Sequence, residues 1–196
     1  VSLRSHGWSR SNNKNEYTKI AKKYPKLDPR YIFINQGFNL RPTDVQAAMG
    51  LNQFERLNKF IKIRADNRKK IIESLKKDPR WKNQYRFIEV PKNIYPSFMG
   101  LPVFLNENMT KDIKMRLLLY LESKGIETRP ILTGNFLNQP SINTFSLNHK
   151  KLKFKGAQSI EDLGFLIGLH THEINQKQLN LIKNSFLFID SLTKNL

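Results

Sequence analysis

The sequence predicts an α+β fold, in which a long helix leads to a small, mostly antiparallel sheet with helices packed on one face. Apolar residues recur at helical spacing from about residue 45 to residue 71. After residue 80, short strand-like runs alternate with amphipathic helical segments. We therefore expect three regions: a polar stretch at 1–35, a linking helical region at 36–80 and a small C-terminal α/β domain at 81–196.

The first region has no clear period and contains several turn formers, and only Arg30–Asn35 in it resembles a strand. A capping-box pattern, Thr43 with Gln46, then predicts a helix that begins at about Asp44. The helical pattern continues to about residue 77, with a bend or break near Asn58. An Asp-Pro pair at 78–79 ends it.

The second half carries the alternating pattern on which the fold class depends. The expected strands are 86–90, 97–105, 126–132 and 165–170, and the expected helices are 110–124, 157–164 and 173–192. Because proline cannot donate to a ladder, Pro102 predicts an edge or a bulge and Pro130 predicts an edge. Gly125 is expected at the end of the first of these helices.

Composition narrows the class of protein. The chain has 34 Lys and Arg against 16 Asp and Glu, a formal charge of +18, and it has no cysteine. Disulfides and thiolate metal sites are therefore excluded, and no apolar run is long enough to cross a bilayer, so a cytoplasmic protein is expected. The charge is compatible with nucleic-acid binding, but the lysines are scattered and no zinc-finger, RNA-recognition or P-loop pattern occurs. A stand-alone basic binding module for nucleic acid or another anionic partner stays as the alternative.

Two stretches combine groups that bind anions. Gly37, Asn39 and Arg41 precede a helix N-terminus, where an amide, a guanidinium and the helix dipole can hold a phosphate or carboxylate. Ordinary capping explains the same residues. Arg129 precedes the turn Thr133–Phe136, which contains Asn135; the guanidinium is either an anion clamp assisted by free backbone amides or an exposed charge on an edge strand.

His170 and His172 alternate along an extended segment and would share a face. A metal site needs further ligands, and none is evident nearby, so no metal is expected. The rim of a pocket or an ordinary surface position suits these histidines better. No Ser-His-Asp arrangement and no carboxylate pair stands out, so no catalytic residue is nominated.

The stretch GFNLRPTDVQAAMGLNQFERLNKFIKIRADN, residues 37–67, resembles a segment of the DegT/DnrJ/StrS family. These are pyridoxal-phosphate enzymes, sugar-nucleotide aminotransferases and dehydrases, with the fold type I architecture. Upstream, LRSHGWSR resembles the family's Arg-x-His-Gly loop. Downstream, GIETRPILTGNFLNQP and GFLIGLHTHEI resemble the branch that contains the 3-dehydrases of nucleotide-linked 4-keto-6-deoxyhexoses.

The resemblance implies a C-terminal portion whose large cofactor domain lies upstream, with residues 1–35 as its remnant. It implies pyridoxal phosphate as cofactor, but the Schiff-base lysine, which is histidine in the dehydrases, is not in this chain. By resemblance Asn39 reaches the cofactor phosphate of a partner subunit. Four residues are expected to bind substrate: Arg41, Arg129, Asn135 and His170.

The implied partners are a nucleotide sugar, glutamate as possible amino donor, and a second copy of the chain in a homodimer. The isolated chain is expected to be inactive. A purely structural or dimerising domain without a ligand of its own is a third possibility.

Overall fold

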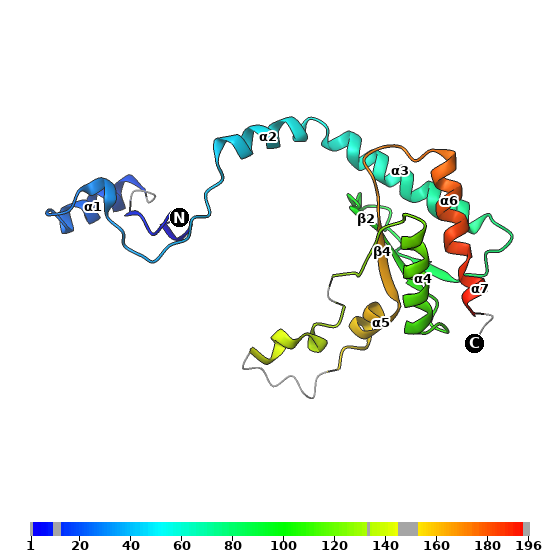
Figure 1. Cartoon of the computed structure of the whole chain (residues 1–196). Helices are drawn as coiled ribbons and strands as arrows, with labels where there is room; N and C mark the ends of the chain where they lie inside the picture. The colour runs from blue at the N-terminus through cyan, green and yellow to red at the C-terminus, as the bar shows by residue number, and fades with distance from the viewer. Residues whose placement is uncertain (1, 10–12, 133, 145–152, 194–196) are drawn as a thin grey trace. The chain divides into compact units, whose positions relative to one another are not determined.

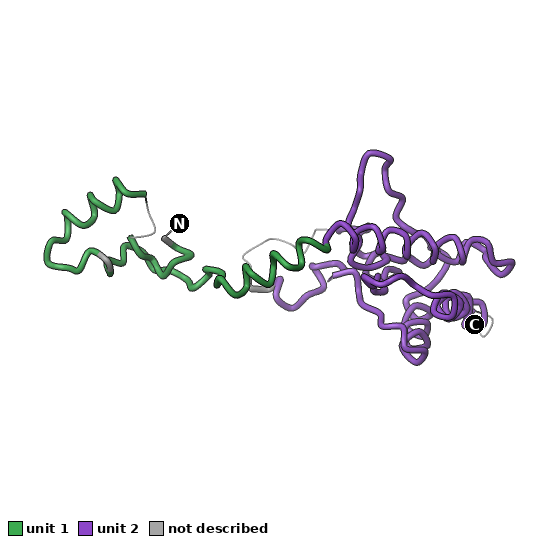
Figure 2. The backbone as a smooth tube through the Cα atoms, turned by 90° about the horizontal axis from the view of Figure 1, so that it is seen from above, with its two compact units in different colours: residues 1–56 green, residues 57–196 purple. Residues whose placement is uncertain are grey.

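The computed structural model describes residues 2–9, 13–132, 134–144 and 153–193. They belong to two compact units, residues 1–56 and 57–196, which Figure 2 draws in green and purple. The division lies within the segment that the sequence presents as one linking region, and the three-region scheme stays a prediction. None of the helices formed by these described residues is both long enough and apolar enough to span a membrane.

The first unit contains a helix where an irregular stretch was expected. Helix α1, Lys14–Lys23, begins after Asn13, whose side chain accepts a hydrogen bond from the backbone N–H of Glu16. The strand expected at 30–35 is wrong. A 3-10 turn occupies Pro29–Tyr31, and, among the described residues, the segment 32–35 takes part in a single isolated bridge, between Trp8 and Phe33.

Helix α2, Asp44–Phe54, has the predicted capping box. The Thr43 N–H donates to Gln46 Oε1 at 2.8 Å, and the Gln46 N–H donates to Thr43 Oγ1 at 3.3 Å. The predicted interruption is also present, since α2 ends at Phe54 and α3, Leu57–Lys76, begins three residues later. The large apolar side chains of α2 itself are exposed, and none of its residues is buried.

The second unit is built on a four-stranded antiparallel sheet in the order β1-β2-β4-β3, which confirms the predicted α+β class. The strands are β1 Tyr85–Phe87, β2 Gly100–Leu105, β3 Thr128–Arg129 and β4 Gly164–Gly168. Its helices are α3, α4 Lys111–Ser123, α5 Lys155–Leu163, α6 Gln176–Leu187 and α7 Ile189–Thr193 (Figure 1). The final helix was expected to be continuous from 173 to 192, but Phe188 separates α6 from α7.

One face of the sheet holds the core. Alternate residues of β2 are buried, and β4, α3, α4, α6 and α7 contribute to the same cluster. The buried members from these elements are Leu101, Val103, Leu105, Phe165, Ile167, Ile71, Leu75, Ile113, Leu117, Leu121, Phe186, Leu187 and Ile189. This arrangement is what the period-2 pattern of the strands and the helical period of α4 predict.

The two prolines differ in how the sheet accommodates them. Pro130 directly follows β3, which is an edge strand as predicted. Pro102 lies in β2, an inner strand, so the edge prediction is wrong for that strand. β1 pairs with residues 103–105 of β2, so it does not reach Pro102. The missing N–H therefore leaves the β1 ladder intact.

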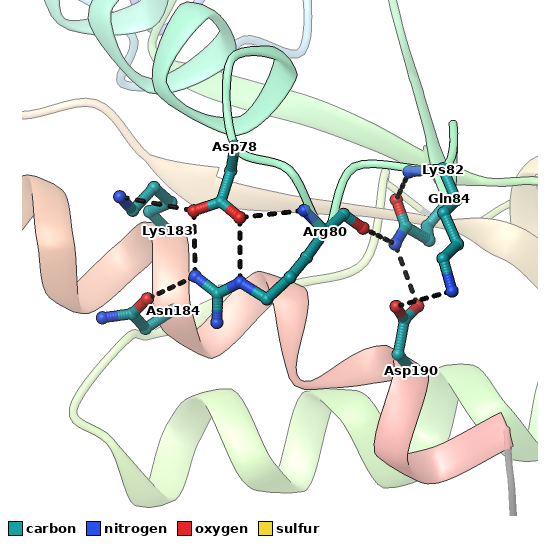
Figure 3. A network of polar contacts seen from close by, with 7 residues as sticks. All are labelled: Asp78, Arg80, Lys82, Gln84, Lys183, Asn184 and Asp190. Carbon is teal, nitrogen blue, oxygen red and sulfur yellow. Dashed lines mark hydrogen bonds and ion pairs between the residues drawn. The ribbon is translucent and has the colours of Figure 1, made fainter.

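The turn from α3 to β1 is fixed to α6 by a polar network (Figure 3). Asp78 accepts two hydrogen bonds from the Arg80 side chain, at 2.8 and 2.9 Å, and lies 3.4 Å from Lys183 Nζ. Arg80 also donates to Asn184 Oδ1 at 2.8 Å. The hydrogen bond from the Arg80 side chain holds the pKa of the Asp78 carboxyl well below its usual range.

Candidate functional site

The segment Gly37–Arg41 is held in extended form against residues 3–7 of the same unit. The His6 N–H donates to the Phe38 carbonyl at 3.1 Å, and the Leu40 N–H donates to the Arg4 carbonyl at 3.0 Å. The backbones approach so closely that a Cβ on Gly37 would lie 2.0 Å from the nitrogen of Gly7. Glycine is therefore required at this contact, for a packing reason rather than for a turn.

Asn39 lies in this ladder as the bridge partner of Ser5, and Arg41 follows it, two residues before the Thr43 cap of α2. Both residues are exposed. Within the described part of the chain, neither side chain makes a hydrogen bond or an ion pair. An amide and a guanidinium are thus available for a ligand beside the positive end of a helix.

Arg129 lies on the exposed edge strand β3 and already has a partner. Its Nε and Nη2 donate to Glu127 Oε1 at 3.0 and 2.6 Å. The pair is largely exposed, so its strength is small and an incoming anion can compete with the carboxylate. Arg129 as a substrate-binding residue stays a prediction.

Asn135 is buried, and it anchors a loop. Its side chain accepts from the Leu137 N–H at 3.2 Å and donates to Gln158 Oε1 at 3.0 Å. Its own N–H donates to Glu161 Oε2 at 2.9 Å, and the Gly134 N–H donates to the Ile131 carbonyl at 3.2 Å. The expectation of free amides is therefore wrong for these two positions; Thr133 lies outside the described residues.

His170 and His172 follow β4 on a loop that α3 holds in place. The Asn67 amide donates to the carbonyls of His170 at 3.3 Å and His172 at 2.8 Å, and its Oδ1 accepts from the Ile174 N–H at 3.0 Å. Asn67 is only 3% exposed. No group of three potential metal ligands occurs among the residues that the structure describes.

Asn67 was not singled out from the sequence, although a signal for it exists. The buried residues of α3 are Ile63, Asn67, Ile71 and Leu75, one every fourth position. A single amide on an apolar stripe indicates a buried polar group that needs partners. The structure thus places Asn39 and Arg41 together in the first unit. In the second unit it places Arg129 on the strand paired with β4, which leads to His170, while Asn135 lies against α5.

Comparison with known proteins gives a consistent set of relatives. The family model described as DegT/DnrJ/EryC1/StrS aminotransferase family matches residues 1–185. The GDP-4-keto-6-deoxy-D-mannose 3-dehydratase of Escherichia coli O55:H7 is 26% identical over 172 residues, which are 88% of this chain and 42% of that protein. The chain therefore spans less than half of that relative's length.

Solved structures agree with this result. The structure of the E. coli GDP-4-keto-6-deoxy-D-mannose-3-dehydratase with bound hydrated PLP matches with a TM-score of 0.70 and 25% identity, over 93% of this chain and 45% of that one. A structure of GDP-4-keto-6-deoxymannose-3-dehydratase with a trapped PLP-glutamate geminal diamine matches with a TM-score of 0.68 and 26% identity, over 92% and 45%. The predicted fold type I relationship is confirmed by these matches.

Proposed function

Because the chain belongs to the DegT/DnrJ/EryC1/StrS aminotransferase family, we propose that it is the C-terminal portion of a pyridoxal-phosphate enzyme acting on nucleotide-linked keto-deoxysugars. The reaction we favour is 3-dehydration, since the relative described above bears that name. Transamination is the alternative. The observation that carries the proposal is the pair Asn39 and Arg41, exposed and available beside the capped end of α2.

The donor groups at this position fit a phosphate. The Asn39 amide would donate to the phosphate of the cofactor, and the Arg41 guanidinium would hold the same phosphate or the substrate beside it. Pyridoxal phosphate, when bound, supplies a ring that withdraws electrons from the reacting carbon. The residues of this chain would bind and orient, and no proton-transfer role is assigned to them.

The second unit would contribute contacts to the substrate. Arg129 would exchange its Glu127 partner for an anionic group, and His170 would line the rim beyond β4. Asn135 would act by holding its loop against α5, because both ends of its side-chain amide are already occupied. Glutamate is a second possible ligand, as amino donor.

We also infer a cytoplasmic homodimer in which Asn39 serves the partner's cofactor. The exposed apolar side chains of α2 support burial of this helix in an assembly. Sedimentation of the complete enzyme tests the dimer, and a monomer that retains cofactor would contradict it.

The test of the cofactor role is Asn39→Ala in the complete enzyme. Loss of one hydrogen bond to a charged phosphate weakens cofactor retention by roughly 1.5–3 kcal/mol. Dialysis followed by the absorbance of bound cofactor measures this. Asn108→Ala, at an exposed position in the turn between β2 and α4, is the control and is expected to retain cofactor like the parent. Equal retention by Asn39→Ala and this control would remove Asn39 from the site.

Nucleic-acid binding is the alternative, and the charge of +18 alone suggests it. Titration of the chain with duplex DNA at increasing salt distinguishes nucleic-acid binding from the pyridoxal-phosphate function. Specific binding with a steep salt dependence would favour the alternative.

A further inference from the structure

One carboxylate of α5 holds the turn 134–138 in the second unit. The Asn135 N–H donates to Glu161 Oε2 at 2.9 Å, and Asn138 Nδ2 donates to Glu161 Oε1 and Oε2 at 3.1 and 3.0 Å. Gln158 lies one helical turn earlier on α5, and its Oε1 accepts from the side-chain amides of the same two asparagines at 3.0 and 3.1 Å. Glu161 is the charged member of this set, so its hydrogen bonds to the turn are the stronger ones.

The backbone beside Glu161 has an unusual conformation. Gly134 has a φ of +63°, and a Cβ on it would lie 2.6 Å from the Cβ of Glu161, so the turn passes directly over this side chain. Leu132 has a φ of +49°, which is uncommon for a residue with a side chain. Its side chain is 87% exposed, so burial does not offset the cost of this conformation. Strain of this kind persists where neighbouring contacts impose it, and it occurs often at ligand contacts.

Glu161 is itself fixed from α4. Lys114 is only 7% exposed, and its Nζ donates to the Glu161 carbonyl and, at 3.5 Å, to the Gly164 carbonyl. These carbonyls lie at the C-terminal end of α5, where a cation is favourable. Lys111 Nζ lies 3.9 Å from Glu161 Oε1. A buried ammonium group is costly to place, and here it holds the residue on which the turn rests.

The turn 134–138 is connected closely to Arg129. The Gly134 N–H donates to the Ile131 carbonyl at 3.2 Å, and this bond joins the turn to the residues that directly follow β3. β3 consists of two residues, Thr128 and Arg129, so its pairing with β4 gives Arg129 little support. Five residues separate Arg129 from Asn135. A displacement of the turn would therefore be transmitted to Arg129.

We propose that Glu161 is a positioning residue, which fixes the segment 129–132 in the conformation that contacts the substrate. This segment presents the guanidinium of Arg129 and the exposed side chain of Leu132 three residues apart. Such a pair suits an anionic sugar derivative in which a hydroxyl group is replaced by hydrogen. Glu161 does not touch the substrate and acts through the turn. The identity of the substrate rests on the proposed function, whereas the anchoring of the turn does not.

Glu161→Ala in the complete enzyme tests the positioning role, with GDP-4-keto-6-deoxy-D-mannose as the probe substrate. If the held conformation falls to about a tenth of the population, the KM rises about tenfold. A merely structural loss reduces the amount of folded enzyme, so it lowers the apparent kcat and leaves the KM unchanged. We expect kcat to change less than about twofold. Glu161→Gln keeps an oxygen that can accept from the Asn135 N–H, so this variant should recover most of the loss in KM.

Hydrogen exchange in the chain reports the anchor without any ligand. The Asn135 amide donates to the Glu161 carboxylate, so it should exchange about tenfold faster in Glu161→Ala. The matched control is Glu107→Ala, which removes the same side chain from an exposed position where it lies 3.1 Å from Arg86. In this control the exchange rate and the KM should stay within about twofold of the parent values.

Faster exchange with an unchanged KM would show that the turn is held but does not serve the substrate, and would overturn the proposal. Unchanged exchange, a fall in kcat alone, or equal effects in Glu161→Ala and Glu107→Ala would overturn it as well. If Glu161→Ala does not fold, Asn138→Ala removes the matching donor from an exposed side chain and takes its place. A parent enzyme that turns over no nucleotide-linked keto-deoxysugar would refute the proposed function and this proposal together, whereas turnover with an unaltered KM in Glu161→Ala refutes this proposal alone.

Discussion

Replacement of Asn67 by alanine tests how the loop after β4 is held. In the structure this amide makes three hydrogen bonds with the loop, to the carbonyls of His170 and His172 and from the N–H of Ile174. All three cross from α3 to a segment more than a hundred residues later in the chain. Alanine keeps the helix but removes every one of these contacts.

The magnitude follows from the number and the burial of these bonds. Each contributes about 1 kcal/mol to stability, which gives about 3 kcal/mol for the three. His172 is exposed, so its carbonyl can regain water in the variant, and we expect a net loss of about 2–3 kcal/mol. With a urea m-value of about 2 kcal/mol/M, the unfolding midpoint should fall by about 1–1.5 M.

Urea unfolding of the chain, followed by circular dichroism, measures this loss. Asn180→Ala is the matched control, because Asn180 is exposed on α6 and its side chain only accepts a hydrogen bond from Gln176 Nε2 at 3.0 Å among the described residues. It should shift the free energy of unfolding by less than about 0.5 kcal/mol. Hydrogen exchange at the Ile174 amide should accelerate only in Asn67→Ala. If the two variants have the same urea midpoint, the Asn67 side chain does not hold the loop.

Three further perturbations follow from other contacts. The pKa of Asp78 is lowered in the folded chain, so the stability it contributes is present above the ordinary carboxyl pKa and is lost as the pH falls below it; Asp78→Asn should therefore flatten the fall of the urea midpoint between about pH 5 and pH 3, and an unchanged slope would contradict this. Gly37→Ala places a Cβ 2.0 Å from the Gly7 nitrogen, so limited proteolysis should cut residues 1–56 faster while the second unit resists; equal rates would refute the close approach. Tyr85→Phe removes the buried bond to the Phe186 carbonyl at 2.6 Å and should lower the free energy of unfolding by about 1 kcal/mol, whereas no change in thermal midpoint would show that the bond adds nothing.

Local signals predicted two features of the fold whose deciding interaction is itself local. The Thr43 capping box and the edge proline Pro130 are examples, since each depends on a few neighbouring residues. Pro102 was misjudged because its position depends on where β1 ends, which is a non-local fact. Helix α1 was missed, although Asn13 and Glu16 mark its start, because its apolar stripe is short, Tyr17, Ile20 and Ala21, in an otherwise polar segment.

The candidate site also combines features expected from nearby residues with features that depend on residues far along the chain. Asn39 and Arg41 are exposed, and their role in an anion-binding segment stays a prediction. The environment of Asn135 could not be predicted, because it depends on Glu161 and Gln158, more than twenty residues later in the chain. The contacts of Asn67 require the packing of α3 against a segment that no local pattern identifies.

The exposed apolar side chains of α2 affect how the chain behaves in solution. Its apolar side chains Val45, Met49, Leu51 and Phe54 are 70%, 67%, 71% and 72% exposed. Such a surface favours contact between molecules, whereas a formal charge of +18 keeps like molecules apart. Salt screens the second effect, with a Debye length of only about 10 Å at 0.1 M, and leaves the first intact. The colloidal stability of the isolated chain should therefore be greatest in dilute buffer and decline as ionic strength rises.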